Sequence, residues 1–297
     1  MFSKEELENF KMQGFHIEDD ILVKYDGDEE VVVIPSGVVF IWEEAFKNNK
    51  KIVKVTFSST VKEIGKFAFY GCDKLRNLVF SDGLTRISGF AFYCNTSLLE
   101  VIFPNSLVEI GEYAFRYCMK VKSVKFNEGL KIIGEYAFDN LNSINEIILP
   151  DSLESIGKSA FVTCGEVSTL KIGKGLSKIS ESCFHGCEKL TEIIIPSNVK
   201  KVGYYAFGNC KMLKKVVVND GVEDISTAAF LNCKFLKIYL PMSLKSISDY
   251  CFIRDPDVDE VPSKVFSVLC DDVNNIPQGW RFKKIKVKDV KKEKEFK

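Results

Sequence analysis

Apolar residues return at a fixed interval of 23 residues along most of this chain. An aliphatic residue stands five positions before each member of a phenylalanine series, and another stands eight before it. The residue immediately before is Ala, except at Cys183 and Cys251. A fixed period of this length is typical of stacked repeats, in which each repeat buries its apolar face against its neighbours. The series comprises Phe46, Phe69, Phe92, Phe115, Phe138, Phe161, Phe184, Phe207, Phe230 and, one residue early, Phe252.

Each repeat predicts one short strand and one tight turn. Apolar residues nine and eleven positions after the phenylalanine, such as Val55 and Phe57, alternate as they do in a strand with one buried face. Gly or Ser four positions before the phenylalanine, in every repeat except the first, which has Trp42, predicts a tight turn. The Ala-Phe segment is expected to form one helical or 3₁₀ turn, since residues at this spacing can share a face.

The consensus L-x-x-I-x-I-P-x-x-[VL]-x-x-I-G-x-x-A-F-x-x-C is plainest between Leu190 and Cys210. It resembles the BspA-like (Treponema-type) leucine-rich repeat family from about residue 31 to 252. The resemblance implies a non-enzymatic solenoid, often a surface protein that binds host or bacterial partners. We therefore predict an α/β repeat solenoid: a right-handed leucine-rich repeat stack with a parallel concave sheet and short helical or 3₁₀ turns on its convex side.

The repeat boundaries predict three parts. Residues 1–33 are expected to form an N-terminal cap of helix and hairpin, 34–252 ten 23-residue repeats, and 253–297 a C-terminal cap and basic tail. The segments 21–27 and 31–35 resemble the first hairpin of the family. Prolines interrupt the period after Phe252, and Trp280 is expected to seal the last repeat.

Composition narrows the class of partner. The chain has 297 residues, 46% of them hydrophobic, and a formal net charge of zero, which argues against nucleic acid. No apolar run is long enough to span a membrane, and the first residues lack a secretory signal. The chain is thus expected to be a cytoplasmic monomer, although a trimmed N-terminus would leave a surface or secreted location open.

Charge gathers at the two ends of the sequence. Residues 1–33 hold ten acidic residues and three lysines, whereas residues 281–297 hold eight lysines, one arginine and three acidic residues. One interpretation is a pair of solvated ends that keep the protein soluble. The alternative is a basic tail that contacts an acidic partner or RNA.

Most of the cysteine and histidine residues that could bind a metal or catalyse a reaction are explained by their positions in the repeat. Six of the ten cysteines lie three residues after a repeat phenylalanine, so buried free thiols are expected, with disulfides as the alternative. Cys183, His185 and Cys187 are too few for a structural zinc site, which needs four ligands. With only two histidines, no catalytic constellation is evident. We expect no catalytic residues, no metal and no cofactor, and hence no enzyme.

The outward side chains of the predicted concave sheet are the best candidates for binding a protein. They could instead form a self-neutralised surface, in which Lys stems cover Ile and reach diagonal Glu residues. Tyr239, beside Val217, is the expected hot spot, since no Glu column accompanies it. The alternative is carbohydrate binding or adhesion through the convex aromatic row Phe67, Phe90, Tyr113, Tyr136, Tyr205 and Tyr250. The partner-binding candidates are Val79, Ile102, Lys125, Ile148, Lys171, Ile194, Lys215, Val217, Lys237 and Tyr239.

Overall fold

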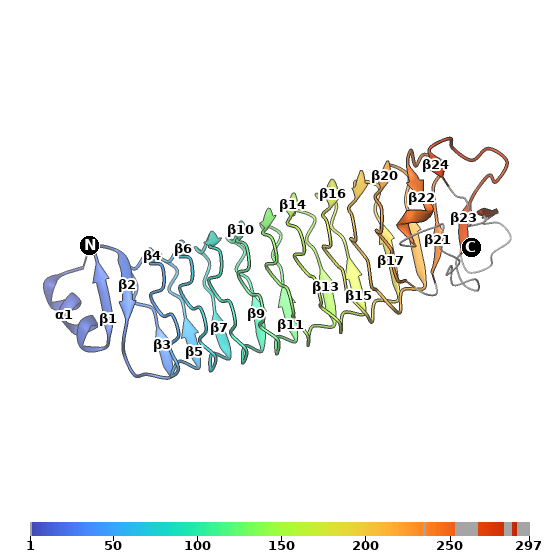
Figure 1. The fold of residues 1–297 in the computed structure, drawn as a ribbon. Helices are drawn as coiled ribbons and strands as arrows, with labels where there is room; N and C mark the ends of the chain where they lie inside the picture. Colours follow the sequence, from blue (N-terminus) through green and yellow to red (C-terminus); the bar gives the residue numbers. More distant parts are fainter. Residues whose placement is uncertain (1, 234–235, 253–266, 282–286, 290–297) are drawn as a thin grey trace. The chain divides into compact units, whose positions relative to one another are not determined.

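The computed structural model describes residues 2–233, 236–252, 267–281 and 287–289 (Figure 1). The chain divides into two compact units, Met1–Ile144 and Asn145–Lys297. Of the predicted C-terminal cap and basic tail, residues 253–266, 282–286 and 290–297 lie outside the described part. None of the described helices is long and apolar enough to cross a membrane.

Unit 1 begins with one helix and one hairpin. Helix α1 (Lys4–Met12) starts at a capping box, in which the Glu6 N–H donates to Ser3 Oγ and the Ser3 N–H donates to Glu6 Oε2. Strands β1 (Phe15–Glu18) and β2 (Ile21–Tyr25) pair antiparallel. The expected hairpin between 21–27 and 31–35 was wrong: β2 pairs with β1 on one side and, in parallel, with a later strand on the other.

From residue 31 onwards, unit 1 winds in coils, each with one long and one short strand. The long strands are β3 (Val31–Val33), β5 (Lys54–Thr56), β7 (Asn77–Val79), β9 (Glu100–Ile102) and β11 (Ser123–Lys125). The short strands are β4 (Phe40–Ile41), β6 (Glu63–Ile64), β8 (Arg86–Ile87), β10 (Glu109–Ile110) and β12 (Ile132–Ile133). The short strands pair in parallel in one sheet, in which β2 lies beside β4, whereas the long strands pair in parallel as β3-β5-β7 and as β9-β11.

Unit 2 repeats the same coil and pairs its strands in parallel. Its long strands are β13 (Glu146–Ile148), β15 (Thr169–Lys171), β17 (Glu192–Ile195), β19 (Lys215–Val218), β21 (Lys237–Tyr239), β23 (Ser267–Cys270) and β25 (Val287–Asp289). Its short strands are β14 (Ser155–Ile156), β16 (Lys178–Ile179), β18 (Lys201–Val202), β20 (Asp224–Ile225), β22 (Ile247–Ser248) and β24 (Trp280–Arg281); a 3₁₀ helix, η1, spans Asp249–Cys251. The ladder therefore continues past the last repeat phenylalanine, because β23 pairs with β21 and β24 with β22.

The repeat phenylalanines form the core of each unit, as predicted. Every one of them is buried, and within each unit successive rings stack on one another. In unit 1 the Phe92 ring lies 5.1 Å from Phe69 and 5.0 Å from Phe115. In unit 2 the Phe207 ring lies 5.5 Å from both Phe184 and Phe230. The apolar period thus sets the core register in both units.

The predicted helical or 3₁₀ turn at the Ala-Phe segment is not confirmed. Residues two before and two after the phenylalanine, such as Phe67 and Gly71, adopt positive φ angles of 57° and 68°. A left-handed residue interrupts a helix, and it turns its N–H towards the next coil. The Phe67 N–H donates to the Gly89 carbonyl at 3.2 Å, and the Phe69 N–H donates to the Ala91 carbonyl at 2.7 Å. Hydrogen bonds between coils therefore take the place of a helical turn.

Candidate functional site

The outward side chains of the long strands form a surface that we call the long-strand face. In unit 1 it comprises Val33, Thr56, Val79, Ile102 and Lys125, placed by the parallel register of β3, β5 and β7 and of β9 and β11. Val33, Val79 and Ile102 expose 60%, 42% and 48% of their surface. Three predicted candidates therefore share this face. Val33 was missed, although one period counted back from Thr56 reaches it.

In unit 2 the candidate residues of the long strands are exposed on β13, β15 and β17 and half-buried on β19 and β21. Ile148 and Ile194 are exposed, at 46% and 60%, and Lys171 lies opposite Ile148 in the register. The remaining candidates, Lys215, Val217, Lys237 and Tyr239, are half-buried. The most exposed apolar candidate of this unit is therefore Ile194, and not the expected hot spot.

Tyr239 is held by a contact that the sequence did not indicate. Its hydroxyl donates to Asp271 Oδ2 at 2.6 Å. Burial raises the pKa of Tyr239, and the hydrogen bond to Asp271 and the charge of that carboxylate raise it further. An acidic group thus accompanies Tyr239 after all, and its hydroxyl already has a partner within the chain. The absence of a Glu column therefore did not reveal the acid that holds Tyr239, because Asp271 lies outside the repeats.

Ion pairing differs between the two sheets. Within the described ranges, no carboxylate lies within 4.0 Å of Lys125 Nζ or Lys171 Nζ, so direct pairing does not neutralise this part of the long-strand face. On the short strands of unit 1, Arg86 lies 3.5 Å from Glu63 and 3.3 Å from Glu109. The long-strand face therefore presents exposed aliphatic residues and lysines, whereas the short-strand sheet carries ion pairs.

The aromatic row of unit 1 packs on itself. Its rings lie 4.9 Å apart between Phe67 and Phe90, 4.6 Å between Phe90 and Tyr113, and 5.0 Å between Tyr113 and Tyr136, with interplanar angles of 29° or less. A sugar ring stacks on the open face of an aromatic ring, but here neighbouring rings cover these faces. This arrangement disfavours the carbohydrate alternative in unit 1.

A buried ion pair lies beside this row. Arg116 Nε lies 2.6 Å from Asp139 Oδ2, and the two side chains expose 25% and 3% of their surface. The guanidinium centre lies 4.6–5.4 Å from the ring centres of Tyr113, Tyr117 and Tyr136. The rings and the carboxylate together enclose the cation, so the cluster is occupied from within the chain.

The ten cysteines are free thiols, as predicted, but they do more than fill space. Cys72 Sγ donates to the Phe46 carbonyl at 3.1 Å, and Cys118 Sγ donates to the Phe92 carbonyl at 3.2 Å. Asn95, at the same place in its coil, donates to the Phe69 carbonyl. Burial raises the pKa of Cys72 and of Cys118 to about 12, which leaves little reactive thiolate. These thiols serve as donors between coils.

Cys183, His185 and Cys187, which are too few for a structural zinc site, each make a different contact. Cys183 and Cys187 are buried, and Cys187 Sγ faces the Phe161 carbonyl at 3.8 Å. His185 Nε2 accepts from Asn209 Nδ2 at 3.1 Å, while Asn209 Oδ1 accepts from Asn232. In the described part of the chain, no three His, Cys, Asp or Glu side chains are arranged to hold a metal ion.

His185 is expected to make stability depend on pH. Burial lowers its pKa from the usual 6.5, and its buried Nδ1 has no partner among the described residues. A second proton on the ring would point at the amide nitrogen of Asn209. The neutral ring is thus favoured in the folded state, so stability is fully present above pH 6.5 and declines as the pH falls towards the lowered value.

Urea unfolding between pH 8 and pH 5.5 checks this expectation. The difference in unfolding free energy between wild type and His185→Asn should shrink or reverse as the pH is lowered. Met212→Ala, at an exposed residue that carries no titratable group, is the control and should leave the pH dependence of the wild type in place. Parallel curves for wild type and His185→Asn would show that His185 does not titrate on unfolding.

Comparison with known families gives a match over most of the chain. The family model described as the BspA type leucine rich repeat region matches residues 25–145 and 131–259, with six copies. Comparison with curated proteins found no match.

Solved structures with the same fold come from several bacteria. A leucine-rich repeat protein of T. pallidum is 29% identical, over 68% of this chain and 88% of that chain, with a TM-score of 0.50. The pneumococcal vaccine antigen PcpA is 22% identical, over 92% and 84%, with a TM-score of 0.57. A leucine-rich repeat protein of Bacteroides ovatus is 20% identical, over 95% and 88%, with a TM-score of 0.50. The last two likenesses concern the fold alone.

Proposed function

Because the chain belongs to the BspA-type leucine-rich repeat family, we propose that it is an interaction scaffold that binds a protein partner through its long-strand face. Members of this family are generally non-enzymatic scaffolds. We also propose the finer features of the fold, a right-handed coil with the long strands on its concave side. The boundaries of the caps at residues 33 and 253 belong to the same proposal.

The distribution of exposed aliphatic residues supports this face over the others. Ile102 of unit 1 and Ile194 of unit 2 stand on long strands, exposed by about half or more. Lys125 in unit 1 and Lys171 in unit 2 accompany them on long strands, with no carboxylate within 4.0 Å among the described residues. Exposed apolar anchors within a charged surround are what a protein partner desolvates on binding. In unit 1 the rings of the aromatic row stack on one another, which favours a protein over a sugar there.

Ile102→Asp is expected to weaken partner binding by at least about tenfold, because a charge replaces an apolar anchor at the interface. Ile132 offers a matched control, since it is also exposed in unit 1, at 41%, but stands on a short strand. Ile132→Asp should change the affinity less than about twofold.

A photoreactive amino acid placed at position 102 or at position 132 first captures the partner by cross-linking. The affinity is then measured between the purified partner and each variant of this chain. We expect the cross-link from position 102 only. Cross-links from both positions, or equal affinities for the two Asp variants, would contradict the proposal.

A further inference from the structure

Strand β3 has one backbone edge that no described strand occupies. It is the first strand of the sheet β3-β5-β7. The Lys54 N–H donates to the Glu30 carbonyl and the Ile34 N–H donates to the Thr56 carbonyl, so Val32 lies between the groups that face β5. In a parallel ladder alternate residues face opposite sides. The N–H and C=O groups of Val31 and Val33 therefore point away from β5, and none of the described residues pairs with them.

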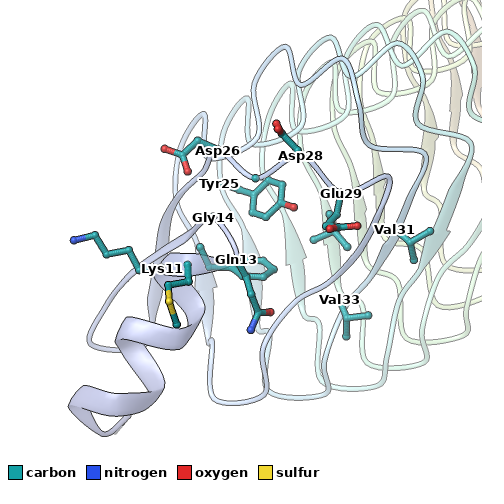
Figure 2. Close-up of a pocket in the computed structure, with 13 residues that line it drawn as sticks. Lys11, Gln13, Gly14, Tyr25, Asp26, Asp28, Glu29, Val31 and Val33 are labelled. Carbon is teal, nitrogen blue, oxygen red and sulfur yellow. The ribbon is translucent and has the colours of Figure 1, made fainter.

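The coil before β3 is only half built. Strand β2 fills its short-strand position and pairs with β4, but the long-strand position beside β3 holds no described strand. A pocket of about 660 Å³ lies there, lined by the end of α1, the segment from Tyr25 to Glu29, and β3. Figure 2 shows this pocket with Val31 and Val33 along one side, Lys11 and Gln13 on the side of the helix, and Asp28 and Glu29 between them. We call this pocket the edge slot.

The lining of the edge slot indicates which kind of segment fits. Val31 and Val33 are exposed by 58% and 60%, and Met12 by 81%, which offers apolar contact to an added strand. At the start of β3, Glu29 and Glu30 are exposed and lie within 4.0 Å of no described cation.

The other two carboxylates of the segment are already paired. Asp26 pairs with His16 and with Lys24, and Asp28 pairs with Lys51. The negative charge thus gathers at one end of β3, at Glu29 of the lining and at Glu30 next to it in the sequence, whereas Lys11 lies on the side of the helix and the strand itself is apolar.

We propose that β3 is a strand-addition site, which takes up an extended segment of a partner protein with alternating apolar residues and a pair of Lys or Arg residues at one end. The backbone of the segment pairs with Val31 and Val33, its apolar side chains contact the exposed valines, and its basic end meets Glu29 and Glu30. The added strand completes the missing half of the first coil. This site shares Val33 with the long-strand face but includes neither Ile102 nor Ile194, the anchors of the proposed function.

Two labelled peptides, Ac-KKVTVTVT-NH₂ and Ac-TVTVTVKK-NH₂, test the proposal by fluorescence polarisation on the full chain. One of them should bind saturably, the one whose direction suits β3. The same peptide with Glu in place of Lys, or with N-methylated amides at alternate positions, should bind at least about tenfold more weakly. Saturable binding that neither change weakens would overturn the proposal, as would no saturable binding of either peptide.

Variants of β3 separate backbone pairing from side-chain contact. Val33→Pro removes an outward N–H without touching the ladder to β5, so it should weaken the peptide by about tenfold, whereas Val33→Ala should cost less. If Val33→Pro fails to fold, the N-methylated peptide still tests the same hydrogen bonds.

Two further measurements distinguish other sites and occupants. Ile102→Asp should leave peptide binding unchanged, so failure of this site and failure of the proposed function are told apart. If the chain self-associates and the peptide disrupts that association, the occupant of the edge slot is a second copy of this chain. That result would overturn the proposal that a segment of another protein binds there.

Discussion

Replacing Phe115 with alanine is expected to lower the free energy of unfolding by about 3–5 kcal/mol. The Phe115 ring is fully buried and stacks between Phe92, at 5.0 Å, and Phe138, at 5.5 Å, with the edge of Phe103 at 5.6 Å. Hydrogen bonds between successive coils hold the backbone on both sides, so the surroundings cannot collapse into the space that the ring leaves. Urea unfolding followed by circular dichroism measures the loss.

Met119→Ala is the matched control for this substitution. Met119 belongs to the same coil but exposes 41% of its surface, so its truncation should cost no more than about 0.5 kcal/mol. Phe115→Leu keeps most of the volume and should fall between the two. A loss below about 1 kcal/mol for Phe115→Ala would mean that the coil relaxes around the cavity and that the stack is not rigid.

The buried core could be predicted because burial follows from the position of a residue within the 23-residue repeat. A side chain that returns every 23 residues meets its own copy in the next coil, so position in the period alone decided that Phe92 and Phe207 are buried. The same counting placed Ile102 and Ile194 on the outward side of their strands, where the structure has them. Alternation within a three-residue strand suffices for that result.

The conformation of the turns could not be predicted from the same pattern. The spacing of Ala and Phe is compatible with a helical turn, but Tyr113 and Tyr136 adopt φ angles of 56° and 52°. Bulky residues seldom adopt such angles, and nothing in their identity indicates them. The Tyr113 N–H donates to the Glu135 carbonyl of the next coil, and the rings of Tyr113 and Tyr136 stack; both contacts arise only once the coils are assembled.

Contacts between residues that are not a whole number of repeats apart could not be predicted from the sequence either. Tyr239 and Asp271 lie 32 residues apart, after the period has ended, so counting repeats could not bring them together. The parallel pairing of β23 with β21 and of β24 with β22, both formed by residues after Phe252, was missed for the same reason. Arg116 and Asp139, by contrast, lie one period apart, and that spacing could have revealed their pairing. The depth of burial of Asp139 could not be inferred, since its column holds polar residues elsewhere.

Replacing Arg116 with methionine is expected to lower the free energy of unfolding by about 3–5 kcal/mol, because it removes a cation that lies against a buried carboxylate. Asp139 exposes only 3% of its side chain and Arg116 Nε lies 2.6 Å from it. Asn140 Nδ2 also donates to Asp139 Oδ1 at 2.6 Å, but a neutral donor does not replace the charge of the guanidinium. Methionine keeps the length of the side chain among the tyrosine rings, so the loss reports charge more than packing.

The double variant Arg116→Met/Asp139→Leu separates the pair from its surroundings. Once both charges are removed, no buried ion remains unpaired, so the double variant should be more stable than Arg116→Met alone. Lys211→Ala is the control, since it breaks the exposed pair with Glu188 and should cost no more than about 1 kcal/mol. Urea unfolding of the wild type, Arg116→Met, Asp139→Leu and the double variant gives the coupling energy directly. If Arg116→Met costs as little as Lys211→Ala, water must reach Asp139, and the tyrosine rings then do not seal the ion pair.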